Sequence, residues 1–387
     1  MFLNMVLKIS FRSIFNTSFV LLYIYMMLKC QNPGHKRPPP VKQIKCQNPE
    51  QFVVFHKTHK CAGTSIQRIL LRYAHKHNLT LVLPSNGVHL QFYIDEHVNN
   101  VNNTEWFKAG LIPNIFCLHS HHWSYSEVAK LMSKSLTKPV YFSILRDPVS
   151  VFMSAWDYYE LSKRTTTWLK FSRPLSLEEF ALMDNKPKVL HWNHLNFRDV
   201  SLYEFGLRVT DNDNMTAVED KIEEIDQTFD LIMIVEHFEE SMVLLKDLLC
   251  WPPQDMVSLK LNVHEESSKS TLSEKAKLKL KEWLKADYKL YDHFARKLKN
   301  EIQKIGSSEM SLELEAYRQW NKEAEAKCPL KFLPKSKLPR EDRPWGAGVL
   351  GYQVLNKDHE CQLMAMQELK FIDMLRNSQK KRALSSS

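Results

Sequence analysis

The chain has 387 residues, 44% of them hydrophobic, and 53 Lys and Arg against 44 Asp and Glu give it a formal net charge of +9. Such a chain can bury one sizeable core, and its positive excess suits an anionic ligand, acidic membrane surroundings or simply a basic soluble surface. Nucleic-acid binding is disfavoured, because no zinc-finger, RNP-like or basic-zipper pattern organises the charge.

The N-terminus contains an apolar run at residues 14–28, preceded by Lys8 and Arg12 and followed by Lys29 and a Pro-rich stretch at 33–40. A cleaved signal peptide and a short membrane anchor both fit this pattern. We favour an anchor, because no convincing small-residue cleavage site follows the run. The basic residues on both sides orient the anchor only weakly.

The next informative segment predicts a strand at residues 52–55, a turn of Lys, Gly, Thr and Ser residues, and a helix at 65–77. The free N–H groups and the dipole at a helix start favour anions, and the hydroxyls of Thr64 and Ser65 add further donors. The segment therefore predicts a loop that binds a phosphate-like group.

This loop departs from the nucleoside-triphosphatase pattern. Lys60 precedes Gly63, whereas that pattern places its Lys after a second Gly, and no earlier Gly is present. A kinase or ATPase is therefore disfavoured. Taken alone, the loop fits equally well a surface turn whose Thr and Ser cap a helix.

A cluster of histidines, His119-Ser-His121-His122, follows a predicted strand at residues 115–118. Sites of α/β proteins assemble at the carboxyl ends of strands, and a neutral imidazole there can accept a hydroxyl proton. Histidines that merely pack in the core are the alternative. A metal site is disfavoured, because no distant carboxylate motif accompanies the cluster.

A second strand–turn–helix segment decides in favour of a ligand site. The run at residues 140–145 predicts a buried strand that ends in Arg146, and Asp147 before Pro148 is a strong helix start. Ser154 lies about two turns into that helix, so Arg146 and Ser154 can reach one phosphate. Two phosphate sites at neighbouring strand ends indicate a doubly charged nucleotide.

The rest of the chain alternates short β-runs with helical patterns, which predicts an α/β protein with a mainly parallel sheet. Further strands are expected at 80–83 and 231–235. Further helices are expected at 124–133, 148–160, 177–183, 239–249 and 273–299. Residues 330–345 are Pro-rich and basic, and are expected to be extended or loop-like. Glu236 could face the site, but its surroundings indicate a structural helix start.

These motifs resemble the Golgi carbohydrate sulfotransferases, most closely the galactose-3-O-sulfotransferase family, which includes galactosylceramide sulfotransferase. The likeness spans roughly residues 50–380. The residues that carry it are 56–65, 145–148 with Ser154 and Tyr158-Tyr159, 235–242 and 284–294. The resemblance implies a P-loop-like, three-layer sulfotransferase fold with a mainly parallel central sheet. It further implies transfer of a sulfuryl group from 3′-phosphoadenosine 5′-phosphosulfate (PAPS) to the 3-hydroxyl of a β-galactose on a glycolipid or glycoprotein, with no metal required.

The same resemblance assigns the donor site. Lys60 takes the position of the family's loop lysine and is expected at the bridging oxygen of the donor. His59 and Cys61 stand where related enzymes often have Pro and Thr, which leaves Lys57 as a substitute or helper. The loop N–H groups of Ala62, Gly63, Thr64 and Ser65, with the Thr64 and Ser65 hydroxyls, are expected to hold the 5′-phosphosulfate. Arg146 and Ser154 are expected to hold the 3′-phosphate.

A His-x-His at a comparable place in related uronyl sulfotransferases points to His121 as the catalytic base, with His119 beside it. His122 is the alternative in register. Two other functions stay open: another carbohydrate sulfotransferase acting on uronic acid or hexosamine, and an inactive membrane-tethered protein that binds glycans.

The resemblance also implies a type II Golgi membrane protein. We expect a cytoplasmic tail at 1–13, the anchor at 14–28, a stem at 29–50, a luminal catalytic domain at 51–380 and a disordered tail at 381–387. Glycosylation triplets begin at Asn78, Asn102 and Asn214. The seven cysteines lack metal-site spacing, so disulfides are expected in an oxidising lumen, with Cys328 and Cys361 as the predicted pair.

Overall fold

The computed structural model of the protein describes residues 48–91, 101–192, 195–261, 270–344 and 349–386. The described residues all belong to one compact unit. The expected cytoplasmic tail and anchor lie outside the described residues, and so does all of the expected stem before residue 48. Within the described ranges, no helix combines the length and the apolar character needed to cross a bilayer.

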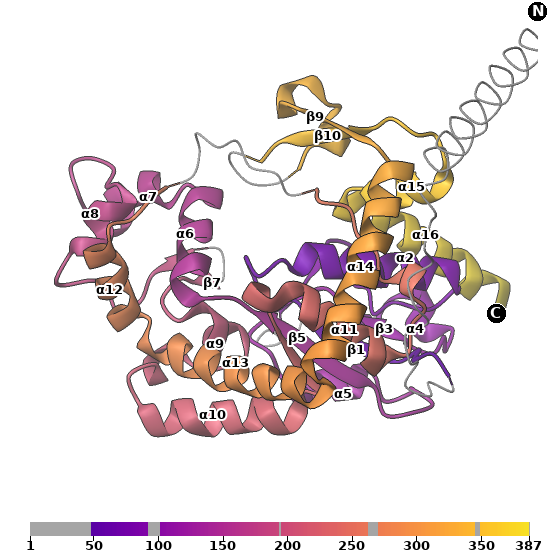
Figure 1. The fold of residues 1–387 in the computed structure, drawn as a ribbon, viewed down its shortest axis with the longest axis horizontal. Coiled ribbons are helices and arrows are strands. Elements are labelled where there is room, and N and C mark those ends of the chain that lie inside the picture. The colour runs from indigo at the N-terminus through magenta and orange to yellow at the C-terminus, as the bar shows by residue number, and fades with distance from the viewer. Residues whose placement is uncertain (1–47, 92–100, 193–194, 262–269, 345–348, 387) are drawn as a thin grey trace, which may run out of the picture. The chain divides into compact units, whose positions relative to one another are not determined.

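A four-stranded parallel sheet forms the centre of the fold (Figure 1). In spatial order its strands are β3 (Ile115–Phe116), β1 (Val53–His56), β5 (Val140–Leu145) and β8 (Leu231–Ile234). Nearly every residue in these strands is buried, as expected for parallel strands that are covered on both faces. The predicted α/β class with a mainly parallel central sheet is confirmed.

Helices and small sheets surround this centre. The helices include α2 (Gly63–Lys76), α5 (Tyr125–Leu131), α6 (Pro148–Tyr158), α9 (Val200–Glu204), α10 (Met215–Thr228) and α11 (Phe238–Leu249). The others are α4 (Glu105–Lys108), α7 (Leu161–Trp168), α8 (Leu177–Leu182), α12 (Glu274–Trp283), α13 (Lys285–Ile305), α14 (Ser307–Lys327), α15 (His359–Ala365) and α16 (Glu368–Ser386). The two-stranded sheets pair β2 (His89–Gln91) with β4 (His119–His121), β6 (His191–Trp192) with β7 (Leu195–Asn196), and β9 (Leu330–Leu333) with β10 (Gly351–Val354).

The prediction of a strand at residues 80–83 is wrong. Leu81 makes only an isolated parallel bridge to Ile115. Its backbone N–H donates to the Gln379 side chain at 2.8 Å, and its carbonyl accepts from the same amide at 3.1 Å. A side chain from α16 thus takes the place of a neighbouring strand, and nothing local in the sequence announces this.

The helix predicted at 273–299 is two helices, α12 and α13, which meet at Leu284. The backbone groups at this break have tertiary partners. The Asp287 N–H donates to the Asp199 carboxylate at 3.0 Å, and the Trp283 carbonyl accepts from Arg198 at 3.3 Å. These bonds replace the intrahelical bond that would otherwise join Trp283 to Asp287.

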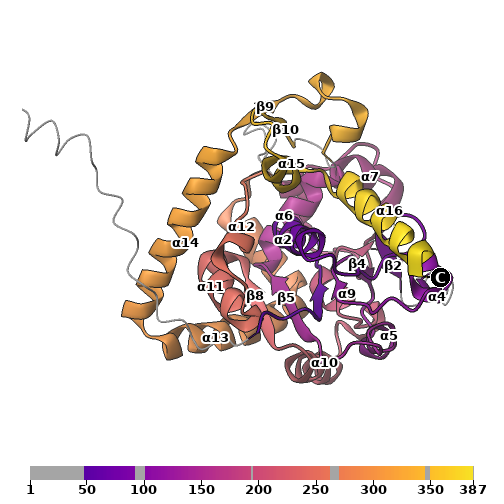
Figure 2. The same cartoon turned by 90° about the vertical axis from the view of Figure 1, so that its right-hand side faces the viewer.

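The prediction of a disordered tail from residue 381 is wrong as well, because α16 continues to Ser386. Ala383 is buried, and the Arg382 guanidinium donates to the carbonyls of Asn78 and Leu79. Figure 2 shows α16 lying beside α2 and reaching α4. The last helix is therefore part of the core.

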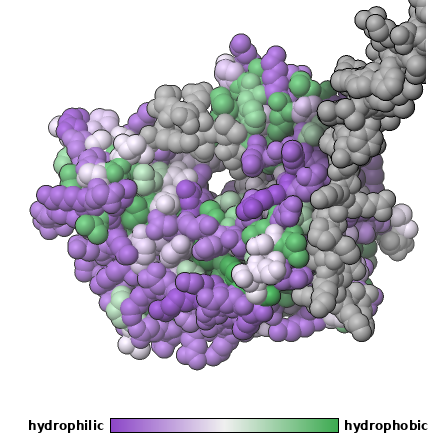
Figure 3. Space-filling view, in the orientation of Figure 1, coloured by the Kyte–Doolittle hydropathy of each residue, from purple (hydrophilic) through white to green (hydrophobic). Residues whose placement is uncertain are grey.

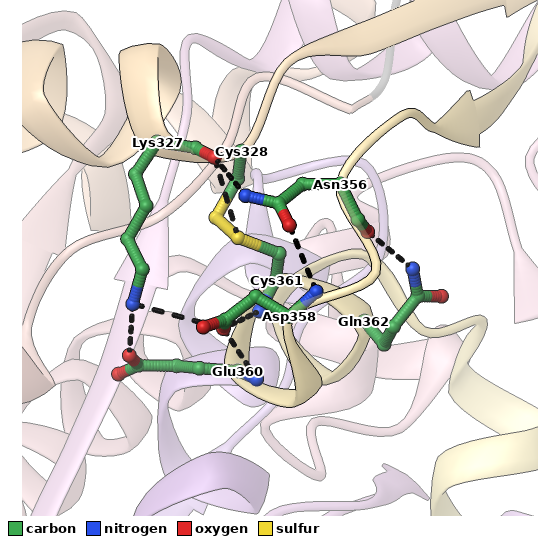
Figure 4. Close-up of a disulfide and its surroundings, with 7 residues drawn as sticks. All are labelled: Lys327, Cys328, Asn356, Asp358, Glu360, Cys361 and Gln362. Carbon is green, nitrogen blue, oxygen red and sulfur yellow. Dashed lines mark hydrogen bonds and ion pairs between the residues drawn. A yellow bond between two sulfur atoms is a disulfide. The ribbon is translucent and has the colours of Figure 1, made fainter.

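The predicted disulfide between Cys328 and Cys361 is present and joins the end of α14 to α15 (Figure 4). Around it, the Lys327 carbonyl accepts from Asn356 at 2.7 Å, and the Lys327 ammonium pairs with Glu360 at 2.9 Å. The disulfide closes the segment that contains β9 and β10. Such a cross-link stabilises a fold mainly by restricting the unfolded chain.

Candidate active site

The loop between β1 and α2, residues 57–62, has a backbone shaped to hold an anion. Lys60 has φ 61° and Ala62 has φ 58°, both in the left-handed region that non-glycine residues rarely adopt. Within the described residues, the N–H groups of Cys61, Ala62, Gly63 and Thr64 have no acceptor. Alternating left- and right-handed residues turn successive N–H groups into one concavity, which binds anions.

The start of α2 completes this concavity. A Cβ atom at Gly63 would lie 2.9 Å from Cγ of Lys57 and 3.4 Å from the Thr58 carbonyl oxygen, so glycine alone fits here without a shift. Thr64 and Ser65 follow in the first helical turn and are partly exposed. Their hydroxyls and the N-terminal end of the helix dipole therefore border the same loop.

Two cations stand at this loop. Arg146, at the end of β5, donates from Nη1 to the Lys60 carbonyl oxygen at 3.3 Å. The Lys60 ammonium lies 3.3 Å from the ring centroid of Tyr158. Neither Lys60 nor Arg146 forms an ion pair with a carboxylate in the described part of the chain. Burial and then the charge of Arg146 lower the pKa of Lys60 to about 7. An anion bound here would neutralise charge that the fold leaves uncompensated.

Ser154 lies on α6 together with Tyr158. Residues four apart share one face of a helix, and the Tyr158 ring on that face meets Lys60. Ser154 is therefore on the side of α6 that faces the loop. The structure thus brings together Lys60, Ala62–Ser65, Arg146 and the Ser154 face of α6.

Lys57 is held differently. Its side chain is buried, and its ammonium donates to Gln67 at 2.7 Å and to both oxygens of Glu368, in α16, at 2.9 Å. Although burial opposes it, the charge of Lys57 lowers the pKa of Glu368. The structure therefore places Lys57 under the loop, where it attaches α16, instead of in the anion concavity.

Glu236 has structural partners, as its sequence surroundings indicate. One of its carboxylate oxygens accepts the N–H of Asp147 at 3.1 Å, and the other accepts the hydroxyl of Tyr291 at 3.2 Å. Asp147 in turn caps α6 by accepting the N–H of Ser150 at 2.8 Å. Glu236 thus supports the turn that presents Arg146.

Among the histidines, His119 lies directly beside the loop. Its ring stacks on His59 with centroids 4.0 Å apart, and its Nδ1 lies 3.1 Å from the Lys57 carbonyl oxygen. A carbonyl can only accept, so Nδ1 carries the hydrogen and Nε2 of the neutral ring holds the basic lone pair. His119 therefore has the tautomer that a general base needs.

The other two histidines are placed differently. His121 ends β4, opposite Gln91, and its side chain lies outside the described part. His122 lines a pocket of about 620 Å³ together with Trp123, Tyr125 and Lys221, and no residue of the β1–α2 loop contributes to that pocket. Burial lowers the pKa of His122.

His59 is bound by Glu204, the last residue of α9. The His59 N–H donates to one Glu204 oxygen at 2.9 Å, and the His59 Nδ1 contacts the other. Burial raises the pKa of Glu204 to about 8, while burial and then the charges of Lys57 and Lys60 lower the pKa of His59 to about 3. Both shifts favour the uncharged forms, a protonated Glu204 and a neutral His59.

Comparison with known proteins decides the family. The family model described as Galactose-3-O-sulfotransferase matches residues 1–379. The chain belongs to the galactose-3-O-sulfotransferase family. It is 31% identical to galactose-3-O-sulfotransferase 2 of Mus musculus over 373 residues, which cover 90% of this chain and 88% of the relative. It is 27% identical to galactosylceramide sulfotransferase of Mus musculus over 344 residues, covering 85% and 79%. The resemblance seen in the motifs is confirmed.

In this galactose-3-O-sulfotransferase family member, the residues that depart from the expected loop pattern have identifiable surroundings. His59 is held by Glu204, as described above. Cys61 is a free, buried thiol, and burial raises its pKa to about 12, which disfavours the reactive thiolate. The sequence singled out both positions without indicating their partners.

Glu204 and Tyr158 are the functional candidates of this family member that motif reasoning did not assign. A signal for Glu204 exists, since it is an acidic residue inside the apolar run Val200–Leu207, and a carboxyl there must find a partner. Tyr158 belongs to a conspicuous aromatic pair, but such residues more often pack in the core.

Proposed function

We propose that the chain is a sulfotransferase that moves the sulfuryl group of PAPS to the 3-hydroxyl of a β-galactose on a glycolipid or glycoprotein. The observation that supports this best is the β1–α2 loop, whose N–H groups lack acceptors among the described residues and lie beside the uncompensated cations Lys60 and Arg146. Membership of a family whose relatives carry galactose-3-O-sulfotransferase in their names supports the acceptor.

The donor is held at both ends. The N–H groups of Ala62, Gly63 and Thr64, with the Thr64 and Ser65 hydroxyls, bind the 5′-phosphosulfate. The Ser65 N–H, also expected there, donates to the Ala62 carbonyl at 3.0 Å. Arg146, as a planar fork, and Ser154, as a hydroxyl donor, bind the 3′-phosphate. Lys57 supports the loop from below through its pair with Glu368.

The reaction is an in-line displacement at sulfur. The galactose oxygen forms the new S–O bond while the bond from sulfur to the bridging phosphate oxygen breaks. Lys60 stabilises the negative charge that develops on that bridging oxygen. No metal is required, since Lys60 and Arg146 supply the positive charge.

The acceptor hydroxyl loses its proton to a histidine. Nε2 of His119 carries the lone pair in the neutral ring, and this supports His119 as the base. His121 is the base that the family resemblance indicates, and His122 is the alternative in register.

The cellular setting follows from the same proposal. The protein is a type II Golgi membrane protein with its anchor at residues 14–28 and its catalytic domain in the lumen. The exposed positions of Asn78, Asn102 and Asn214 are compatible with glycans there, and the disulfide suits an oxidising compartment. The glycosylation of these asparagines is tested by a shift in mobility after glycosidase treatment.

The decisive experiment supplies the purified full-length chain with radiolabelled PAPS and an acceptor panel of galactosylceramide, lactosylceramide and N-acetyllactosamine. Transfer to galactose, lost in Lys60→Ala, is the expected result. Transfer only to uronic acid or hexosamine acceptors would redirect the proposal to another carbohydrate sulfotransferase. Glycan binding without transfer to any acceptor would identify a glycan-binding protein and would contradict the proposed function.

A further inference from the structure

Glu204 connects the two segments that the proposed reaction needs side by side. Its carboxyl group binds the β1–α2 loop through the N–H and the ring of His59, and the N–H contact is 2.9 Å long. Its backbone carbonyl accepts the N–H of Trp123 at 2.7 Å. Trp123 lies in the β4–α5 segment, residues 122–124, which directly follows the strand with His119. One residue thus bonds to both the loop and the histidine segment.

The carboxyl group suits this double contact because it is deeply buried, with 1% of its side chain exposed. In its protonated form one oxygen accepts the His59 N–H, while the O–H donates to Nδ1 of His59. Lys57, Lys60 and Glu368 are the charged groups that act on His59, and Asp287 interacts with Glu204. A neutral hydrogen-bonded pair is stable among these charges without disturbing the loop's cations.

The helix that presents Glu204 is fixed at both of its ends. At its start, the Asp287 carboxylate accepts the N–H groups of Ser201 and Leu202, each at 2.9 Å. Just past its end, a Cβ atom at Gly206 would lie 2.4 Å from the Trp123 carbonyl oxygen, so the chain passes in close contact there. Glu204 therefore stands on a rigid base and not on a mobile loop.

The β1–α2 loop needs such support. Lys60 and Ala62 keep left-handed conformations, which non-glycine residues retain only where the surroundings enforce them. His59 immediately precedes Lys60, and its ring also stacks on His119 at 4.0 Å. Holding His59 thus fixes the loop on one side and the orientation of the His119 ring on the other.

We propose that Glu204 is a positioning residue for sulfuryl transfer, which holds the β1–α2 loop in its anion-binding shape through His59 and keeps the His119 segment beside it through Trp123. This inference rests on the proposed function, because it assigns Glu204 a role in binding the donor. It predicts that Glu204 governs the donor more than the acceptor.

The test uses the full-length protein with Glu204→Ala, Glu204→Gln and the control Glu313→Ala. Glu313 is also a buried carboxylate, but it pairs with Lys246 on α11, away from the loop. The readouts are calorimetric binding of adenosine 3′,5′-bisphosphate, KM for PAPS and for galactosylceramide, and the melting temperature. Glu204→Ala is expected to weaken bisphosphate binding and raise the donor KM about tenfold or more through the loss of both bonds.

Two further results are expected. Glu204→Gln restores donor binding to within about threefold, because its amide reproduces the acceptor and donor of a protonated carboxyl group. Glu313→Ala lowers the melting temperature but leaves the donor KM unchanged. If Glu204→Ala does not fold, His59→Ala, which removes a ring that is 10% exposed and leaves the N–H contact, is expected to give a smaller donor-specific loss.

The outcomes separate the two proposals. Bisphosphate binding by the unchanged chain together with unchanged binding in Glu204→Ala, or in His59→Ala where that variant is used, overturns the positioning role alone. Equal rises in donor and acceptor KM also overturn it, because they indicate general damage. Absence of bisphosphate binding by the unchanged chain overturns the proposed function, and the positioning role with it.

Discussion

The β1–α2 loop and the surface formed by α10 and α13 are both rich in cations, but the two regions differ in whether carboxylates pair with those cations. On the α10–α13 surface, which is strongly hydrophilic in Figure 3, Lys289 pairs with Glu219, and Lys297 and His293 pair with Asp226. At the loop, Lys60 and Arg146 have no such partner among the described residues. The net charge of +9 therefore does not locate the site, whereas uncompensated charge does.

The sharpest test of this contrast is Lys60→Ala. Removing a preorganised cation from a leaving-group oxygen costs about 10³-fold in kcat. Sulfate transfer to galactosylceramide measures the loss, and Lys289→Ala is the matched control because its charge is already paired. Equal activity in the two variants would remove the distinction between the regions.

His119→Ala comes next, with an expected fall in kcat of about 10²-fold through loss of the general base. Calorimetry should show bisphosphate binding within about threefold of the unchanged chain, because the bonds between His59 and Glu204 that hold the loop remain. His121→Ala and His122→Ala, measured in parallel, assign the base. A larger loss in either of them would move the role away from His119.

Arg146→Lys is expected to raise the KM for PAPS about tenfold while changing kcat less. Lysine keeps the charge but lacks the planar fork that binds phosphate in two places. The kinetics of this variant should be compared with those of Lys297→Arg on the paired surface, which we expect to match the unchanged chain. An unaltered donor KM in Arg146→Lys would show that charge alone suffices.

A smaller effect is expected on the number of protons taken up when the bisphosphate binds. The pKa of Lys60 is about 7, and a bound anion favours the charged ammonium and raises that pKa. Binding of the bisphosphate at pH 8 should therefore take up a proton, and affinity should fall as the pH rises above 7. Calorimetry in buffers of different ionisation enthalpy measures the uptake. Lys60→Arg, which stays charged, should bind without it, and uptake in that variant would point to another group.

The smallest effect is expected on the paired surface itself. Lys289→Ala should change the free energy of unfolding by less than about 1 kcal/mol, because exposed ion pairs contribute little. Urea denaturation measures the change. A loss of several kcal/mol would mean that this surface carries more than solvated charge.

The parts that sequence reasoning predicted correctly depend on local patterns. The apolar run of β5 has the predicted bounds, and Asp147 before Pro148 starts α6 as expected. Lys60 and Arg146 meet because the carboxyl ends of parallel neighbouring strands lie at one edge of a sheet.

The parts that it missed depend on partners far along the chain. The side chain of Gln379 bonds to the backbone of Leu81, where a neighbouring strand would otherwise lie. The carboxylate of Asp199 accepts the N–H of Asp287 at the break between α12 and α13 near Leu284. Glu204 reaches His59 across 145 residues. In each case a buried polar group finds its partner only after the chain has folded, so no window of neighbouring residues contains the information.

The ion pair between Lys57 and Glu368 has a consequence for biosynthesis. Because Lys57 and Glu368 lie 311 residues apart in the chain, the β1–α2 loop receives this support only once the segment that contains α16 has been synthesised. Premature stop codons ahead of α16 should thus yield protein without donor affinity. Donor affinity is therefore gained when α16 docks against the loop, and not when the loop itself is made.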